Sequence, residues 1–219
     1  MARDPKGTAR NDPAAGGGAP DRLPRRLALA GGIAAALLAG LGVVLSRREE
    51  AGEAGNQGFG GPFTLTAPDG RTVTDATFHG KYLLVYFGYT YCPDVCPTTL
   101  ANMAKALDRL GKRADALQAI FITVDPARDT PAVMGQYTSA ISPRILGLSG
   151  SPAQIAAAAG AYHVYYAVHR SGPDDRSYAV DHSSVLYLMS PQGAPLALIP
   201  ADEDSDRMAA SIGKYLPAA

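Results

Sequence analysis

Two cysteines, Cys92 and Cys96, are the residues of this 219-residue chain whose type and spacing first indicate chemistry. They are its only cysteines, and a disulfide between residues so close in sequence closes too small a loop to stabilise the fold much. Thiolates are nucleophiles and soft metal ligands, so such a pair forms a redox-active disulfide or holds a soft ion such as Cu(I). If the chain is exported, an ordinary structural disulfide is the alternative.

The cysteines lie between a predicted buried strand and a predicted helix. The apolar run Tyr82–Phe87 indicates the strand. A helix is expected over Pro97–Leu110, because proline suits a first helical turn and Gly111 suits a C-terminal stop. The N-terminus of a helix offers free N–H groups and a partial positive charge, which favour thiolate over thiol. We therefore expect the pair to have thiolate character.

Two thiolates leave a Cu(I) site incomplete, and the chain has four histidines. His79 falls in a predicted turn, and His163 and His169 flank a predicted strand, so we expect ordinary surface or structural roles for these three. His182 precedes the apolar run Val185–Leu188, and functional side chains of α/β sheets gather where strands meet loops. The residues alone do not choose among the four histidines.

The rest of the pattern alternates strands and helices. Further strands are predicted at 119–124, 145–148, 164–168, 184–189 and 196–199, helices near 130–139, after Ser151 and over 205–216, and a short hairpin at 63–66 and 72–74. This order predicts an α/β domain with helices on both faces of a sheet. The formal net charge is zero, so nucleic acid is not an expected partner.

The N-terminal part is typical of a membrane-targeting segment. Residues 1–26 form a predicted disordered tail rich in Gly, Pro and charge, and residues 27–45 are uncharged and apolar over 19 positions. That length suits a transmembrane anchor better than a cleaved signal peptide or a buried helix. Because Lys and Arg are in excess before the run, we expect the tail to be cytoplasmic, with a linker at 46–60 and a domain at 61–219 on the periplasmic or equivalent outer face.

Three segments carry a family resemblance. These are Tyr86–Leu100 (YFGYTYCPDVCPTTL), Thr123–Pro131 (TVDPARDTP) and Val180–Leu188 (VDHSSVLYL). Together they resemble the signature of the Sco/SenC family of copper proteins. The resemblance implies a thioredoxin-like fold with an added N-terminal β-hairpin, preceded by one transmembrane helix.

The resemblance also implies site residues. It implies that Cys92, Cys96 and His182 bind copper, as Cu(I) with three ligands or as Cu(II) with a fourth ligand or water. Asp125 matches an acidic residue near the family's metal site, where it acts electrostatically or on a ligand, unless it only caps the chain after the strand at 119–124. Arg128 and Asp129 are candidates for a structural ion pair with each other.

For function, the resemblance implies a metallochaperone rather than an enzyme. Such a protein delivers copper to the CuA centre of a haem-copper oxidase, or reduces the cysteines of that centre. Expected partners are the CuA-bearing subunit, a second copper chaperone or a thiol reductant, and the membrane. A metal-free thiol-disulfide oxidoreductase is the alternative, although that class uses Cys-x-x-Cys. A peroxidase would need a single peroxidatic cysteine in its own motif, which is absent, and a redox or copper sensor would use the same residues.

Overall fold

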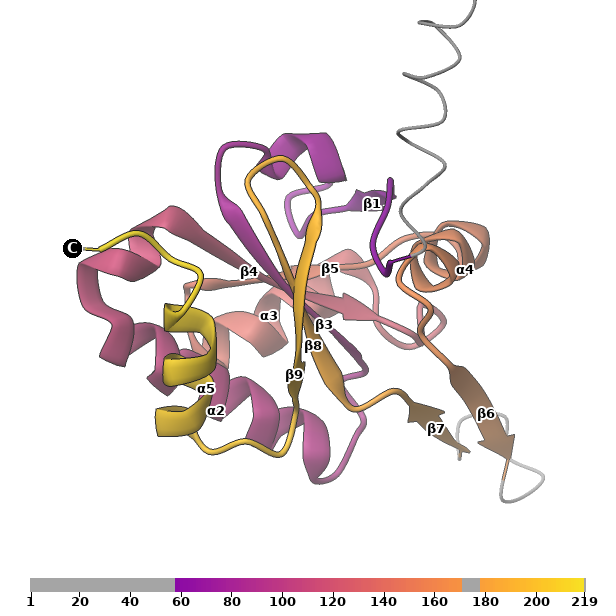
Figure 1. The fold of residues 1–219 in the computed structure, drawn as a ribbon. Coiled ribbons are helices and arrows are strands. Elements are labelled where there is room, and N and C mark those ends of the chain that lie inside the picture. The colour runs from indigo at the N-terminus through magenta and orange to yellow at the C-terminus, as the bar shows by residue number, and fades with distance from the viewer. Residues whose placement is uncertain (1–57, 171–177, 219) are drawn as a thin grey trace, which may run out of the picture. The chain divides into compact units, whose positions relative to one another are not determined.

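The computed structural model describes residues 58–170 and 178–218, and Gly58–Ala219 group into one compact unit (Figure 1). The predicted tail and anchor, and most of the predicted linker, lie outside the described residues. Within the two described ranges, no helix has the length and apolar character needed to cross a membrane.

The elements follow one another in the order that the sequence pattern predicts, with additions. They are β1 (Thr64–Thr66), β2 (Thr72–Thr74), the 3-10 helix η1 (Asp75–Phe78), β3 (Tyr82–Gly88), α2 (Val95–Leu110), the 3-10 helix η2 (Gly111–Ala116), β4 (Leu117–Thr123), α3 (Pro131–Ile141), β5 (Ile145–Leu148), α4 (Pro152–Ala161), β6 (Tyr166–Arg170), β7 (Tyr178–His182), β8 (Val185–Met189), β9 (Pro195–Pro200) and α5 (Ser205–Gly213).

Five strands form the central sheet in the order β5-β4-β3-β8-β9. The strands β3, β4 and β5 are parallel, whereas β8 and β9 run antiparallel to their neighbours. Nearly all of β3 and β4 is buried, because both faces of the sheet are covered, and this explains why both strands are continuous apolar runs. Gly88 pairs with Thr123, so the carboxyl ends of β3 and β4 lie side by side.

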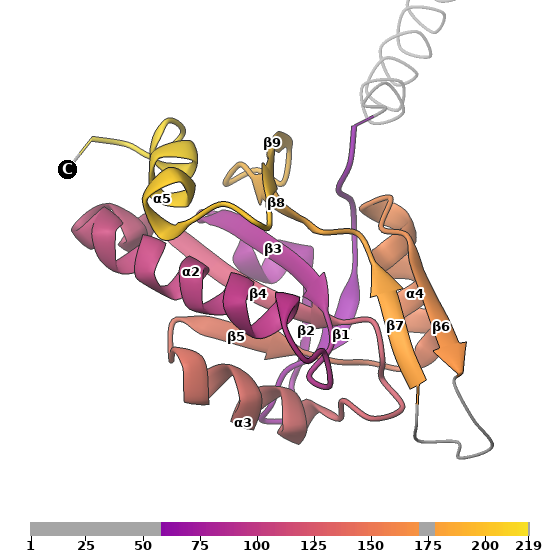
Figure 2. The ribbon, with the colours of Figure 1, turned by 90° about the horizontal axis from the view of Figure 1, so that it is seen from below.

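Consecutive aromatic residues of β3 show which elements cover each face of the sheet. The Tyr86 ring stacks on Phe121, whose ring contacts Tyr137 of α3. The Phe87 ring points to the opposite face and contacts Tyr162 at the end of α4, 5.5 Å between centroids. Figures 1 and 2 both place α4 apart from α2 and α5, which pack against each other. The prediction of helices on both faces is therefore confirmed.

The N-terminal hairpin is also present. β1 pairs with β2 in antiparallel register, and the turn between them contains Gly70, whose φ of +83° suits glycine. The Gly70 N–H donates to the carbonyl of Ala67 at 2.9 Å, which closes the turn.

The structure corrects the predicted start of one helix and adds one strand. Helix α2 begins at Val95 rather than Pro97, so Cys96 belongs to its first turn. Proline is tolerated there, because the first N–H groups of a helix have no intrahelical partner. A whole strand, β7, was missed, and His182 is its last residue. β7 pairs with β6 in a separate two-stranded sheet, and its five residues, YAVDH, contain an apolar run of only three.

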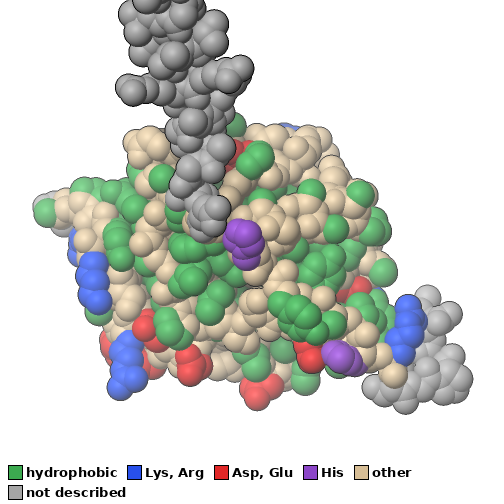
Figure 3. Space-filling model, turned by 45° about the vertical axis from the view of Figure 1, so that its right-hand side comes forward, with side chains coloured by type: hydrophobic (Ala, Val, Ile, Leu, Met, Phe, Trp, Pro, Cys, Tyr) green, Lys and Arg blue, Asp and Glu red, His purple; other side chains and the backbone are tan. Residues whose placement is uncertain are grey.

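On the face drawn in Figure 3, hydrophobic and uncharged side chains predominate, and most acidic and basic side chains lie toward its lower margin.

Candidate metal centre

Three potential metal ligands converge beyond the carboxyl end of β3. Cys92 lies in the loop that follows β3, Cys96 in the first turn of α2, and His182 at the end of β7. One ligand atom from each residue lies within 4.8 Å of the other two. The Cys96 Sγ is 3.3 Å from the His182 Nε2. Among the described residues, no other group of three or more Cys, His, Asp or Glu side chains meets this criterion.

The Cys96 sulfur occupies a space that the end of β3 leaves open. A Cβ added at Gly88 would lie only 2.7 Å from this sulfur and 2.8 Å from the Phe121 ring. The Cys96 N–H points to the Cys92 Sγ at 3.5 Å, and the buried Tyr86 hydroxyl lies 3.9 Å from the Cys96 Sγ. The absence of a side chain at Gly88 therefore allows α2 to bring Cys96 against the sheet.

Burial sets the protonation state of Cys96. Its side chain is completely buried, and this desolvation raises the pKa of the thiol to about 12. The expectation that the helix N-terminus would favour a thiolate is therefore wrong for Cys96 in the metal-free protein. Because burial disfavours the charged sulfur more than the helix terminus favours it, an incoming metal ion has to displace a proton from Cys96.

His182 is held in the form that binds metals. Its Nδ1 donates to the Ser183 carbonyl at 3.1 Å, and since a carbonyl only accepts, the Nε2 lone pair is left facing Cys96. The rings of Tyr86 and Tyr89 meet the imidazole edge to face, 5.9 and 6.1 Å between centroids. Burial lowers the pKa of His182, which keeps the ring neutral at neutral pH.

The donor set fits a soft ion. Two sulfurs and one imidazole nitrogen are ligands that Cu(I) and Zn²⁺ accept, but structural Zn²⁺ is nearly always held by four protein ligands. No fourth Cys, His, Asp or Glu belongs to the group among the residues that the structure describes. The chemistry of the donors therefore favours Cu(I) over Zn²⁺.

Comparisons with known proteins agree with these features. The SCO1/SenC family model matches residues 51–217. The chain belongs to the SCO1/SenC family. It is 44% identical to Protein SenC of Rhodobacter capsulatus over 171 residues, covering 78% of this chain and 76% of that protein. It is 41% identical to the mitochondrial SCO1 homolog 1 of Arabidopsis thaliana over 145 residues, covering 66% of this chain but only 43% of that longer protein.

A solved structure of the family has the same fold. The structure of Bradyrhizobium japonicum ScoI with copper bound superimposes with a TM-score of 0.66 at 44% identity, covering 72% of this chain and 99% of that one. The predicted thioredoxin-like fold is thereby confirmed.

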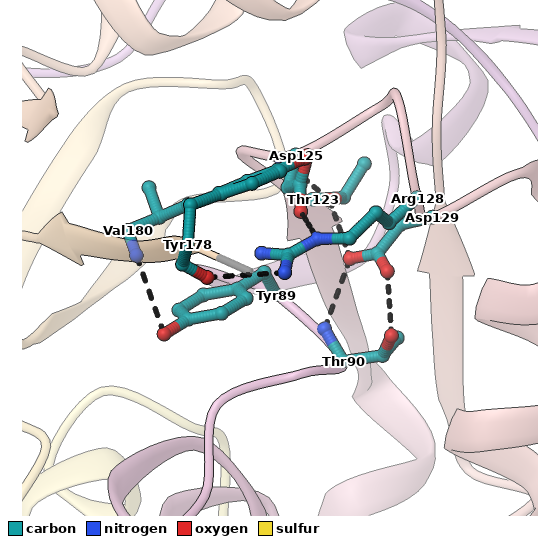
Figure 4. Close-up of polar contacts among 8 residues, drawn as sticks. All are labelled: Tyr89, Thr90, Thr123, Asp125, Arg128, Asp129, Tyr178 and Val180. Carbon is teal, nitrogen blue, oxygen red and sulfur yellow. Dashed lines mark hydrogen bonds and ion pairs between the residues drawn. The ribbon is translucent and has the colours of Figure 1, made fainter. Parts of the chain in front are cut away.

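Asp125, which the resemblance places near the metal site, is not one of the three grouped donors of this SCO1/SenC protein. Its buried carboxylate accepts a hydrogen bond from the Tyr178 hydroxyl at 2.7 Å and pairs with Arg128 (Figure 4). Asp129 instead accepts from the Thr90 N–H and hydroxyl. The predicted pairing of Arg128 with Asp129 is therefore wrong.

The other histidines do not join the group. His169 pairs with Asp181 at 2.8 Å on the exposed side of the β6–β7 hairpin, and His79 lies 4.0 Å from Asp75 near η1. His163 is exposed, with a φ of +55°.

Several residues that shape the metal centre were not identified from the sequence. Gly88, Tyr86 and Tyr89 act through packing on Cys96 and His182, and Ser183 through its backbone carbonyl. A glycine that ends an apolar strand four residues before a cysteine is the one signal that was available. The contact of the Ser183 carbonyl with His182 could not be predicted from the sequence, because every residue has a backbone carbonyl.

We expect Gly88→Ala to disturb both the fold and the donors. The new methyl group would overlap the Cys96 sulfur and the Phe121 ring, so the substitution should destabilise the domain by about 1–3 kcal/mol, the usual cost of overpacking a core. Urea unfolding measures this change. Gly160→Ala is the matched control, because its methyl group meets nothing within 4 Å and α4 should gain up to about 1 kcal/mol. Equal stability of Gly88→Ala and the unmodified protein would contradict the close packing at Gly88.

Proposed function

We propose that this protein is a membrane-anchored copper chaperone that serves the assembly of a haem-copper oxidase, by delivering copper to the CuA centre or by reducing the cysteines of that centre. The observation that carries the proposal is the convergence of Cys92, Cys96 and His182, with their ligand atoms within 4.8 Å of one another. Membership of the SCO1/SenC family and the copper-bound state of the Bradyrhizobium relative support it.

The unequal exposure of the donors suits a carrier of ions. Cys96 is buried, whereas Cys92 and His182 are both partly exposed. A thiolate of the acceptor protein would therefore reach Cys92 or His182 before Cys96 and replace one of them. The buried Cys96 would stay bound until further acceptor ligands arrive, so that the ion is never released to water.

The same two sulfurs can carry out the reductive role. In that reaction Cys92 and Cys96 form one S–S bond while the S–S bond of the CuA subunit breaks, and two electrons and two protons pass to the subunit. The disulfide form would have no thiolates for copper. Both cysteines are free thiols in the structure, which is the state that either role requires.

Cu(I) binding tests the proposal directly. The reduced domain should bind one Cu(I) per chain in anaerobic competition with a chromogenic chelator, and His182→Ala should weaken binding about 10-fold or more, because the site loses one of three ligands. His79→Ala is the matched control and should bind as the unmodified protein does, since His79 lies outside the group. Absence of tight binding, with persisting disulfide-reductase activity, would instead indicate a metal-free thiol-disulfide oxidoreductase.

We expect Cu(I) affinity to rise with pH. The pKa of Cys96 is raised to about 12, so its proton is displaced by the metal throughout the neutral range, and the apparent association constant should rise at least 10-fold per pH unit from about pH 6.5 to 8. His182, with a lowered pKa, stays neutral over this range and adds no proton until the pH falls through that pKa. The measurement is a competition titration at several pH values, corrected for protonation of the chelator. A pH-independent affinity would contradict a protonated Cys96.

The proposal places residues 27–45 in the cytoplasmic membrane as a single uncleaved span, with residues 1–26 in the cytoplasm and the domain at 61–219 on the outer face. The length of the apolar run and the excess of Lys and Arg before it support this orientation. Protease added to spheroplasts should digest the domain and spare an N-terminal tag. A domain that is protected until the cells are lysed would overturn the orientation.

A further inference from the structure

Strand β7 presents one of its faces to the body of the domain. Alternate residues of a strand share a face, so Tyr178, Val180 and His182 point the same way. The observed burial follows this alternation, since Val180 is only 4% exposed, whereas its neighbours Ala179 and Asp181 are exposed. The histidine of the metal centre is therefore the last of three inward-facing residues on one short strand.

Each of these three residues makes a polar contact outside the hairpin. The Tyr178 hydroxyl donates to Asp125 at 2.7 Å, and the Val180 N–H donates to the Tyr89 hydroxyl at 3.4 Å. The His182 Nε2 lies 3.3 Å from the Cys96 Sγ. Tyr178 and His182 thus attach opposite ends of β7 to the domain.

The β6–β7 hairpin depends on such contacts for its position. It is a two-stranded sheet separate from the central five strands, and an isolated hairpin is at best marginally stable in water. A groove of about 250 Å³ lies between the hairpin and the loop that follows β4, with Val124, Ile155 and Val168 among its lining residues. Val180 belongs to the hydrophobic core, and Tyr166 and Tyr178 pack against it. Because apolar packing does not fill the groove itself, the polar contacts add to this attachment.

Arg128 is the centre of the attachment at Tyr178. Its guanidinium carbon lies 3.6 Å from the centroid of the Tyr178 ring, its Nη1 donates to the Tyr178 carbonyl at 3.1 Å, and it forms an ion pair with Asp125 (Figure 4). The side chains of Arg128 and Asp125 are only 11% and 4% exposed, so water and salt screen the pair little.

The same guanidinium also faces the loop that carries the first cysteine. It lies 4.7 Å from the centroid of the Tyr91 ring, which precedes Cys92 directly, and 5.6 Å from that of Tyr89, whose ring contacts His182. Arg128 therefore touches the donor-bearing elements on both sides of the centre without being a ligand itself.

We propose that Asp125, Arg128 and Tyr178 form a latch that holds β7 on the domain and thereby keeps His182 against Cys96. They are positioning residues, because they act on the metal centre through the strand and not by touching the ion. The predicted effect of this latch on copper binding rests on the function proposed above.

The first test compares Cu(I) affinity in two backgrounds. Arg128→Lys keeps the positive charge but loses the planar group that stacks on Tyr178 and bonds to its carbonyl. It should weaken Cu(I) binding about 10-fold, in the range usual for residues that orient a metal ligand. In the His182→Ala background the same substitution should weaken binding much less, because the residue that the latch positions is already gone and only the contact of Arg128 with the loop before Cys92 is still lost.

The matched control is Arg109→Lys, which changes an arginine in an exposed ion pair with Asp206 between α2 and α5. It should leave Cu(I) affinity unchanged in both backgrounds. Tyr178→Phe is a second latch variant, which removes only the hydroxyl group that donates to Asp125. It replaces Arg128→Lys in the test if that variant does not fold. It should weaken Cu(I) binding less than Arg128→Lys but show the same dependence on His182.

A second measurement needs no metal. In the metal-free protein, the Val180 amide should exchange its hydrogen with solvent several-fold faster in Arg128→Lys, whereas the amide of Val85 in the central strand should keep its rate. A general loss of stability would accelerate exchange at both positions.

The outcomes separate the two hypotheses. Absence of Cu(I) binding by the unmodified protein would overturn the proposed function, and the exchange of the Val180 amide would then decide the latch alone. If Cu(I) binds, an unchanged affinity in Arg128→Lys, or an equal loss with and without His182, would overturn the latch.

Discussion

The contact between the Cys96 sulfur and the His182 imidazole joins residues that lie 86 positions apart in the chain, and the rest of the centre depends on it. On one side of the contact, Cys96 of α2 is packed closely against the glycine that ends the buried strand β3. The other side is a two-stranded hairpin that extends from the domain. The geometry of the three donors is therefore only as well defined as the attachment of that hairpin.

Burial shifts the pKa values of the two partners in opposite directions but has the same effect on their charge. It raises the pKa of the Cys96 thiol and lowers the pKa of the His182 imidazole, so both are uncharged when no ion is bound. A neutral pocket avoids the cost of an unpaired buried charge. It also means that binding an ion requires release of the Cys96 proton, which couples occupancy of the site to pH.

Two buried aspartates near the carboxyl end of β4 each attach a different surrounding segment to the central sheet. Asp129 receives hydrogen bonds from Thr90 and Thr123 and so ties the segment before Cys92 to the sheet. Asp125 ties β7 to the same region through Tyr178 and Arg128. Segments that carry different metal ligands are thus fastened to the end of one central strand, which is consistent with the position of functional loops at the carboxyl ends of parallel strands.

Short-range features of the sequence determined the α/β order, the N-terminal hairpin and the spacing of the two cysteines, because these depend on apolar runs, turn residues and neighbours a few positions apart. The motifs, through their resemblance to a family, added His182, which the residues alone could not separate from the other histidines. The tertiary structure decided the partner of Arg128, the existence of β7, and the protonated state of Cys96. Each of these depends on which distant residues share a buried space. A local charge pattern suggested Asp129 as the partner of Arg128, but long-range packing pairs Arg128 with Asp125 and Tyr178. A helix terminus suggested a thiolate at Cys96, but desolvation keeps this thiol protonated.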